Sequence, residues 1–297
     1  MNVIEINHLS RDYGNNRGIF DVSFSVAKGE VIGFLGPNGA GKTTTIRHLM
    51  GFIKAQTGTV SIKGLDCWQQ HHQIQQNLGY IPGEMAFFDD MTGAEFLEFM
   101  KKYRNNHPKD RQQEMLDLFE LDPHVKIKKM SKGTKQKLGI VVAFMHDPDV
   151  LILDEPTSGL DPLMQSRFID LILREKERGK TILMSSHMFE EVERTCHRVC
   201  IIKEGRIVAI DSVEELKEQQ VKKYIVTLET EDSAKAFAND YGNVVSLVEN
   251  HVTLIVKNNL SELVALMSNY PITNLSAPVQ SLEEIFLQYY GGNHHVQ

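Results

Sequence analysis

Glycines, a lysine and threonines gather in one nine-residue stretch, GPNGAGKTT at residues 36–44, directly after the apolar run Val31–Leu35. The stretch fits GxxxxGK[ST], a pattern in which glycines let backbone N–H groups close around phosphate oxygens and the following helix points its positive end at the same charge. We expect Lys42 to reach the β- and γ-phosphates of a nucleotide and the Thr43 hydroxyl to coordinate Mg²⁺. The sequence therefore predicts a strand, a phosphate-binding loop and a helix, in that order.

Two acidic residues follow a second buried-strand pattern. Residues 150–153 are four apolar residues, typical of a strand covered on both faces, and Asp154 and Glu155 come directly after them. Acids in this position often cap a helix. Downstream of a phosphate-binding loop they have a second meaning: Asp154 would hold Mg²⁺ through its water shell, and Glu155 would orient or deprotonate the attacking water.

Composition limits the class of protein. A chain of 297 residues with 41% hydrophobic and 24% charged residues has room for one large or two modest globular domains. The formal net charge of -7 argues against nucleic acid as a partner, because neutralising phosphates requires a basic surface. No apolar run approaches the roughly 18 residues of a membrane-spanning helix, and the start of the chain has no signal-peptide pattern, so we expect a soluble, cytosolic chain.

The remaining elements can be placed in order. Alternating apolar and polar residues predict antiparallel strands before the phosphate-binding loop, and Thr92 followed by Glu95 forms a capping box that begins a helical insert. Strands and helices alternate after Glu155, which favours a mainly parallel sheet. The predicted strands are residues 3–6, 20–26, 58–62, 79–82, 150–153 and 181–184, the helical insert is residues 86–146, and a further helix covers residues 163–178.

Taken together, these motifs resemble those of the ATP-binding subunits of ABC transporters, in the family's order over residues 2–215. Walker A corresponds to residues 36–43, Walker B with its catalytic acid to residues 150–155, the D-loop SGLD to residues 158–161, and the switch histidine to His187. The family's signature, usually LSGGQ, corresponds to MSKGT at residues 130–134. This stretch keeps Ser131 and Gly133 but has Lys132 and Thr134 where Gly and Gln are common.

The resemblance implies an α/β fold with a P-loop NTPase core of the RecA-like kind, an antiparallel β-subdomain and a helical subdomain, over residues 1–215. Residues 216–297 lie outside the shared region, and their predicted elements follow the order βαββαβ, a ferredoxin-like α+β pattern, closed by an amphipathic helix at residues 282–289. An extension of this size resembles ATPase subunits of bacterial drug and antibiotic exporters whose permease is a separate chain. Dimer support, regulation and a passive appendage remain open as its role.

In the family, two such domains form a head-to-tail homodimer, and each ATP lies between Walker A of one copy and the signature of the other. The resemblance therefore implies ATP and Mg²⁺ as cofactors, a transmembrane permease as partner, and a place at the cytoplasmic face of the membrane. Tyr13 lies just upstream of the phosphate-loop strand and is either an adenine-stacking residue or a loop tyrosine. The implied nucleotide-binding residues are Tyr13, Gly36, Pro37, Asn38, Gly39, Ala40, Gly41, Lys42, Thr43 and Thr44; the catalytic residues are Glu155, His187 and Lys42; Ser131, Lys132, Gly133 and Thr134 face the partner's ATP; Asp161 belongs to the D-loop; and the metal ligands are Thr43, Asp154 and Glu84.

Three departures or additions accompany the family pattern. The Q-loop glutamine would fall near position 83, where this chain has Gly83 and then Glu84, so either Glu84 takes over the contact or the contact is absent. Phe87 and Phe88 form either the floor of a groove for a permease helix or part of the insert's own core. Six lysines around the signature either add positive potential toward the partner's triphosphate or form a solvated basic helix start; they are Lys126, Lys128, Lys129, Lys132, Lys135 and Lys137.

The leading interpretation is an ATPase subunit that drives export of a drug, antibiotic or peptide-like substrate. A soluble ABC ATPase with an assembly, regulatory or nucleic-acid-remodelling role is the main alternative, and an importer subunit shares all the motifs. A protein that binds nucleotide without hydrolysing it is disfavoured by the presence of Glu155 and His187.

Overall fold

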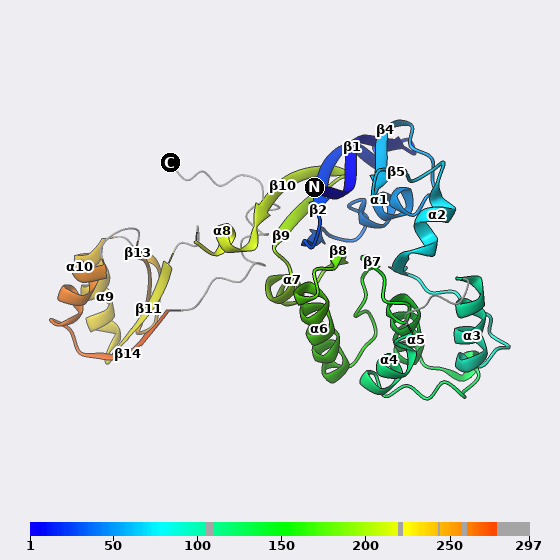
Figure 1. The fold of residues 1–297 in the computed structure, drawn as a ribbon. Helices are drawn as coiled ribbons and strands as arrows, with labels where there is room; N and C mark the ends of the chain where they lie inside the picture. Colours follow the sequence, from blue (N-terminus) through cyan, green and yellow to red (C-terminus); the bar gives the residue numbers. More distant parts are fainter. Residues whose placement is uncertain (105–109, 219–221, 243, 257–259, 278–297) are drawn as a thin grey trace. The chain divides into compact units, whose positions relative to one another are not determined.

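The structure is a computed structural model that describes residues 1–104, 110–218, 222–242, 244–256 and 260–277 of the chain. It divides into two compact units, Met1–Val213 and Glu214–Gln297 (Figure 1). The boundary predicted after residue 215 lies close to this division. Each unit is described separately below.

The first unit is built on a six-stranded sheet with the strand order β10-β9-β3-β8-β7-β6. Its central strands β3 (Val31–Leu35), β8 (Thr181–Ser186) and β7 (Val150–Asp154) run parallel and are buried along their whole length. Such strands lie under covering elements on both faces, which explains their unbroken apolar sequences. The outer strands are β6 (Leu78–Ile81), β9 (Arg198–Lys203) and β10 (Arg206–Ser212).

A second sheet of this unit is antiparallel, with the order β2-β1-β4-β5. Its strands are β1 (Asn2–Asp12), β2 (Gly18–Ala27), β4 (Thr57–Ile62) and β5 (Leu65–Asp66). One buried cluster joins this sheet to the central sheet and to helix α1 (Lys42–Leu49), and includes Ile4, Phe24, Phe34 and Ile46. The helix that follows the phosphate-binding loop is therefore fixed by packing between the two sheets.

Helices between β6 and β7 form a separate group, at the lower right in Figure 1. The predicted capping box is confirmed at the start of α3 (Gly93–Tyr103), where the Glu95 amide donates to Thr92 Oγ1 at 3.2 Å and the Thr92 amide to Glu95 Oε2 at 2.7 Å. The other helices of the group are α4 (Gln112–Leu118), η1 (Ile127–Lys129) and α5 (Lys132–Phe144). Elsewhere the unit contains α2 (His71–Gln76), α6 (Pro162–Glu177) and α7 (Phe189–Thr195). No helix in the described residues is both long enough and apolar enough to cross a bilayer.

The second unit begins with α8 (Val213–Glu218), which starts at the division, and continues into a four-stranded antiparallel sheet with the order β12-β13-β11-β14. With two helices in the chain order βαββαβ, this is the ferredoxin-like arrangement that the sequence predicted. Residues on one sheet face, including Val226 and Leu254, pack with Phe237 and Leu263 from the helices. The elements are β11 (Lys222–Leu228), α9 (Glu231–Tyr241), β12 (Val244–Val248), β13 (His251–Val256), α10 (Leu260–Met267) and β14 (Ile272–Ser276). The predicted helix at residues 282–289 lies outside the described residues.

Candidate active site

The phosphate-binding loop connects β3 to α1 at the carboxyl edge of the central sheet. Two of its glycines have no room for a side chain: a Cβ on Gly36 would lie 2.5 Å from the carbonyl oxygen of Ile202, and one on Gly41 would lie 2.8 Å from Ile19. Gly41 also has a φ of +113°, in the left-handed region that favours glycine. Pro37, Asn38, Gly39 and Thr43 are exposed, so the mouth of the loop faces outward.

Lys42 is buried beneath this loop, with 5% of the residue exposed. Its ammonium donates to the carbonyl oxygens of Gly36 at 2.6 Å and Pro37 at 3.3 Å. It also lies 3.6 Å from Glu155 Oε1. Lys42 therefore connects the phosphate-binding loop to the acid that follows β7.

The two acids after β7 differ in burial and in partners. Asp154 is fully buried; its Oδ1 accepts a hydrogen bond from the Ser185 hydroxyl at 2.5 Å, while its buried Oδ2 has no hydrogen-bond partner among the described residues. Glu155 has a φ of +49°, which is unusual for a residue with a side chain. Its amide donates to the carbonyl oxygen of Ser185 and lies within reach of the same residue's hydroxyl, both at 3.1 Å.

The Glu155 carboxylate lies between a lysine and a histidine. Oε1 faces Lys42, and Oε2 is 3.4 Å from Nδ1 of His187, whose side chain is 58% exposed. The structure thus brings together four residues predicted from three separate motifs: Lys42, Asp154, Glu155 and His187. They follow or end three parallel strands, at the sheet edge where ligands of open α/β sheets bind.

The acid positions also fit a divalent cation. A buried carboxylate oxygen without a protein partner is costly unless something binds it, and Asp154 Oδ2 is such an atom. The exposed Thr43 hydroxyl is a second oxygen donor, and Mg²⁺ prefers oxygen ligands shared between one or two protein groups and substrate phosphates. Within the described ranges no group of three or more His, Cys, Asp or Glu is arranged to hold a metal ion.

Comparison with known proteins identifies the family. Residues 19–158 match the family model described as ABC transporter. Over 97% of the chain, the sequence is 31% identical to YhcH of Bacillus subtilis, described as an uncharacterized ABC transporter ATP-binding protein, of which 96% is covered. The chain belongs to the ABC transporter ATP-binding protein family.

Other members of the family carry more specific descriptions. The bacitracin transport ATP-binding protein BcrA of Bacillus licheniformis is 37% identical over 75% of this chain and 74% of that protein. The linearmycin resistance ATP-binding protein LnrL of Bacillus subtilis is 35% identical over 72% of this chain and 70% of that protein. The resemblance recognised in the sequence is therefore confirmed, and this ABC protein is an ATPase.

Solved structures confirm the fold of the ABC cassette. An ATP-binding subunit of an ABC transporter aligns with a TM-score of 0.66 at 31% identity, covering 73% of this chain and 92% of that one. A dimeric bacterial ABC cassette, MJ0796, aligns with a TM-score of 0.62 at 21% identity, covering 71% and 98% of the two chains. The predicted P-loop core with its β- and helical subdomains is thus the observed fold of the first unit.

The ABC signature lies at the start of α5. Ser131 Oγ accepts from the Thr134 amide at 3.1 Å and lies 2.8 Å from the Thr134 hydroxyl, so Ser131 caps the helix. A Cβ on Gly133 would lie 2.7 Å from the carbonyl oxygen of Gly159 in the D-loop, so these two segments touch through their backbones. In the described part of the chain, no hydrogen bond or ion pair joins residues 131–134 to residues 36–44, and their predicted role toward a partner's ATP stays a prediction.

Other predicted residues of the ABC site have local partners. Asp161 Oδ1 accepts from the Met164 amide at 3.0 Å, so Asp161 caps α6. Tyr13 is exposed, and the guanidinium carbon of Arg11 lies 5.4 Å from its ring centre. Adenine stacking by Tyr13 stays a prediction.

Two of the lysines near the signature are paired with acids. Lys128 lies 3.5 Å from Asp90 and Lys135 lies 3.4 Å from Asp89, so part of the basic charge is neutralised locally. The stem of Lys132 instead lies across Gly159, where a Cβ would meet it at 3.2 Å. Lys132 is thus in contact with the D-loop at the start of α5.

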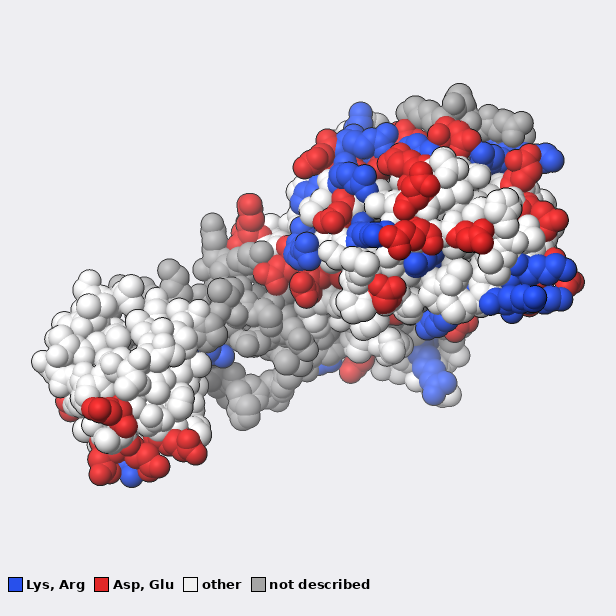
Figure 2. Space-filling model, turned by 90° about the horizontal axis from the view of Figure 1, so that it is seen from below, with Lys and Arg blue, Asp and Glu red and all other residues white. Residues whose placement is uncertain are grey.

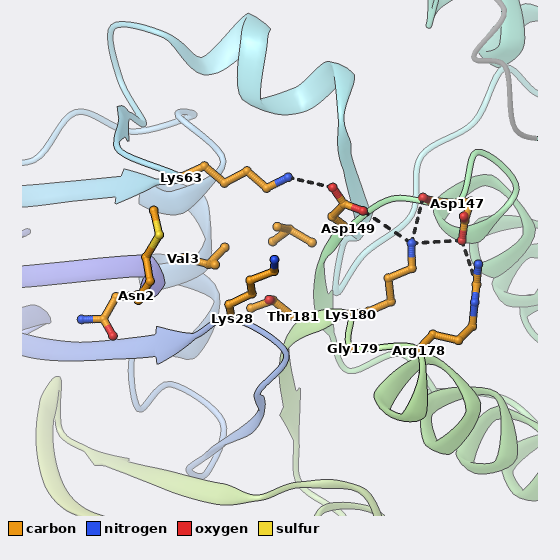
Figure 3. A pocket seen from close by; sticks show the side chains of 12 residues that line it. Asn2, Val3, Lys28, Lys63, Asp147, Asp149, Arg178, Gly179, Lys180 and Thr181 are labelled. Carbon is orange, nitrogen blue, oxygen red and sulfur yellow. Dashed lines mark hydrogen bonds and ion pairs between the residues drawn. The ribbon is translucent and has the colours of Figure 1, made fainter.

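A cavity of about 580 Å³ lies at the opposite edge of the sheet, at the amino ends of β7 and β8 (Figure 3). Its charged side chains largely neutralise one another: Lys180 lies 3.1 Å from Asp147 and Lys63 lies 3.0 Å from Asp149. The cavity contains none of the motif residues. Lys42, Asp154, Glu155 and His187 lie instead at the carboxyl edge of the sheet.

Sequence reasoning missed two serines at the end of β8 that contact the acids after β7 and the residues that follow His187. Ser185 contacts both Asp154 and Glu155. Ser186 Oγ donates to Glu191 Oε2 at 2.8 Å and accepts from the amide of Met188 at 2.9 Å, so the two residues that flank His187 in the sequence are bonded to each other. Glu191 is itself buried, and burial raises its pKa. The available signal was two serines ending an apolar strand, since a polar side chain in a strand covered on both faces needs a buried partner.

We predict that Ser185→Ala lowers ATP hydrolysis at least several-fold and raises the Mg²⁺ concentration needed for half-maximal rate. Without the hydroxyl, Asp154 loses the bond that fixes its carboxylate, a loss that costs about 1–3 kcal/mol when it leaves a buried group unpaired. The measurement is phosphate release against Mg²⁺ concentration. Ser166→Ala on α6 is the control, and an unchanged Mg²⁺ requirement in Ser185→Ala would contradict the role of Ser185.

Proposed function

We propose that this chain is the ATP-hydrolysing subunit of an exporter, in which two copies close head to tail on ATP and drive a drug, antibiotic or peptide-like substrate through a separate transmembrane permease. The contact of Glu155 with both Lys42 and His187 is the observation that carries the proposal, because it assembles a hydrolytic site rather than a binding site alone. Relatives described as bacitracin transport and linearmycin resistance proteins support the direction and the substrate class.

In this mechanism the loop amides and Lys42 bind the β- and γ-phosphates. Lys42 contacts two carbonyl oxygens and the Glu155 carboxylate. When the Lys42 ammonium pairs with a bound phosphate instead, the Glu155 carboxylate becomes free to accept a proton from water. His187 contacts the γ-phosphate from the exposed side. Mg²⁺, held by Asp154 and Thr43, would neutralise charge that develops on the phosphate oxygens.

The signature of the second copy would complete the site. The start of α5 offers backbone N–H groups and the positive end of a helix, and residues 36–44 of the same chain do not occupy it. A γ-phosphate bound to the partner copy satisfies those groups, so ATP itself joins the two subunits.

We expect Glu155→Gln to bind ATP, to lose at least about 100-fold in hydrolysis, and to accumulate as an ATP-bound dimer, because an amide cannot accept the proton from water. Phosphate release and sedimentation velocity with and without ATP measure the two effects. Lys42→Ala is the comparison variant and should lose nucleotide binding, and with it the dimer. Hydrolysis by Glu155→Gln at the wild-type rate would remove Glu155 from the mechanism.

Glu84 is proposed to take the place of the Q-loop glutamine. The residue before it, Gly83, lies against the metal site: a Cβ there would be 3.0 Å from Asp154 Oδ2. A side chain at position 83 would therefore crowd the carboxylate, whereas Glu84 is exposed and free to swing toward the phosphates. A carboxylate is also a better Mg²⁺ ligand than an amide.

Glu84→Ala should raise the Mg²⁺ requirement of hydrolysis and weaken the coupling of hydrolysis to transport, with little effect on stability since the side chain is exposed. Hydrolysis is measured in the isolated chain and in the complex with its permease. Glu98→Ala on α3, another exposed acid, is the matched control. If Glu84→Ala behaves like Glu98→Ala in both assays, the substitute role is excluded.

The permease contact is proposed to lie on an aromatic cluster of the helical subdomain. Phe87 packs edge-on against the buried Phe96 at 5.1 Å between ring centres, so part of the cluster is core. Phe88 and Phe99 lie 5.6 Å apart and are 54% and 42% exposed, an apolar surface of the kind that anchors a partner helix. Of the two roles considered for these aromatics, the core role therefore suits Phe87, and the role in contacting a permease helix suits Phe88.

Purification from native membranes in mild detergent is expected to recover the chain with a polytopic membrane protein. Phe88→Ser combined with Phe99→Ser should reduce that recovery by about tenfold while the isolated chain keeps its ATPase rate, because both rings are exposed. Tyr103→Ser, a third exposed aromatic substitution at the end of α3, is the control. Recovery with soluble partners only would favour the alternative of a soluble ABC ATPase.

A further inference from the structure

Charged side chains of both signs are spread over the surface of the first unit on the face shown in Figure 2, where solvent reaches them. Glu191, on α7, is an exception, with 1% of the residue exposed. The other acids buried among the described residues have evident partners: Asp147 and Glu175 pair with Arg111, and Asp154 belongs to the candidate metal site. No lysine or arginine in the described part of the chain forms an ion pair with Glu191.

The hydrogen bonds of the Glu191 carboxylate lead to the turn that carries His187. Its Oε2 accepts from the Ser186 hydroxyl at 2.8 Å, and the same hydroxyl oxygen accepts from the amide of Met188 at 2.9 Å. The other carboxylate oxygen, Oε1, is buried and has no hydrogen-bond partner among the described residues. Ser186 therefore links Glu191 to the residues on both sides of His187.

Stability of the fold does not account for a glutamate at this place. A buried carboxylate costs free energy unless ion pairs or hydrogen bonds compensate it, and here one of the two oxygens lacks a partner. Burial accordingly raises the pKa of Glu191, against the opposing effects of the Thr157 and Ser186 hydroxyls. An apolar side chain of similar volume would avoid this cost. The carboxylate therefore points to a role in the neighbouring site.

Helix α7 gives Glu191 a fixed base on the central sheet. Val192, the next residue, lies against β3 where Gly33 has no side chain: a Cβ on Gly33 would be 2.5 Å from Val192 Cγ1. Lys176 of α6 donates to the carbonyl oxygen of Thr195, at the end of α7, at 3.1 Å. Helix α7 is thus fixed to the strand that leads into the phosphate-binding loop.

The segment after Glu155 reaches the same place. Thr157 is buried, and its hydroxyl lies 4.0 Å from Sδ of Met188 and interacts with the Glu191 carboxylate. His187 in turn lies 3.4 Å from Glu155. The loop that carries the acid and the turn that carries the histidine therefore converge beside Glu191.

We propose that Glu191 is a positioning residue for ATP hydrolysis, which fixes the turn after β8 through Ser186 and so sets the place of His187 beside Glu155. The side chain of His187 is 58% exposed, so the position of its backbone decides where the ring reaches. The inference rests on the proposed contact of His187 with the γ-phosphate. Without the bond between Glu191 and Ser186 the turn has further conformations open to it, and the ring meets the γ-phosphate in a smaller fraction of molecules.

Glu191→Met tests this role in the full-length chain, because methionine fills a similar volume without a charge. The variant should unfold at the wild-type temperature or above it, yet lose at least about tenfold in kcat for phosphate release while KM for ATP stays within about twofold, since the phosphate-binding loop is untouched. Ser186→Ala removes the same bond from the other side and should lose kcat to a similar extent. Glu191→Gln, whose amide oxygen can still accept from Ser186, should keep at least about a third of the wild-type kcat.

Glu190→Ala is the matched control, because Glu190 is an exposed acid one position earlier on the same helix. It should keep the wild-type kcat. Glu191→Met and Ser186→Ala with the kcat of this control would overturn the proposal. Equal losses in Glu191→Gln and Glu191→Met would overturn it as well, because the hydrogen bond to Ser186 would then not be what matters.

His187→Ala separates this inference from the proposed function. The single variant should lose at least about tenfold in kcat, and adding Glu191→Met to it should cost less than about twofold more, because both changes remove the same contribution. If His187→Ala keeps the wild-type kcat, the proposed role of His187 fails, and the inference with it. If His187→Ala is slow but Glu191→Met is not, or if the two losses multiply in the double variant, the positioning role of Glu191 is overturned and the role of His187 stands.

Discussion

The contact between Lys42 and Glu155 joins two segments that lie far apart in the chain, and it depends on how three buried strands are ordered. β3 and β7 are not neighbours; β8 lies between them, and all three run parallel. Because the three strands run parallel, the loop after β3, the acid after β7 and the histidine after β8 lie at one edge, and their order makes these ends neighbours. The apolar sequences of these strands, covered on both faces, are thus what holds the charged groups together.

The same order explains Ser185. In the pairing of β7 with β8, Asp154 lies directly opposite Ser185, so a hydroxyl on one strand reaches the carboxylate on the next. One carboxylate oxygen is fixed by this bond, and the other has no hydrogen-bond partner among the described residues. A shift of one residue in this register would turn the hydroxyl to the opposite face and separate the pair.

Motifs confined to a few consecutive residues could be predicted from the sequence, because the chain itself fixes their geometry. The loop at residues 36–44, the capping box of α3 and the acids after β7 are of this kind, and so is the alternation of strands and helices after residue 222. Ser185 could not be predicted in its role, since its function comes from a strand register that no local pattern encodes. The position of β12 at the edge of its sheet likewise required the order of the sheet, which the succession of elements alone does not give.

The backbone of Glu155 has a consequence for how this protein can change. A residue with a side chain held at a φ of +49° is strained by about 1–3 kcal/mol, and glycine at the same place would not be. Glycine at this position would relieve the strain but would give a protein without its proposed acid. Selection for ATP hydrolysis is therefore what keeps a carboxylate at this strained position.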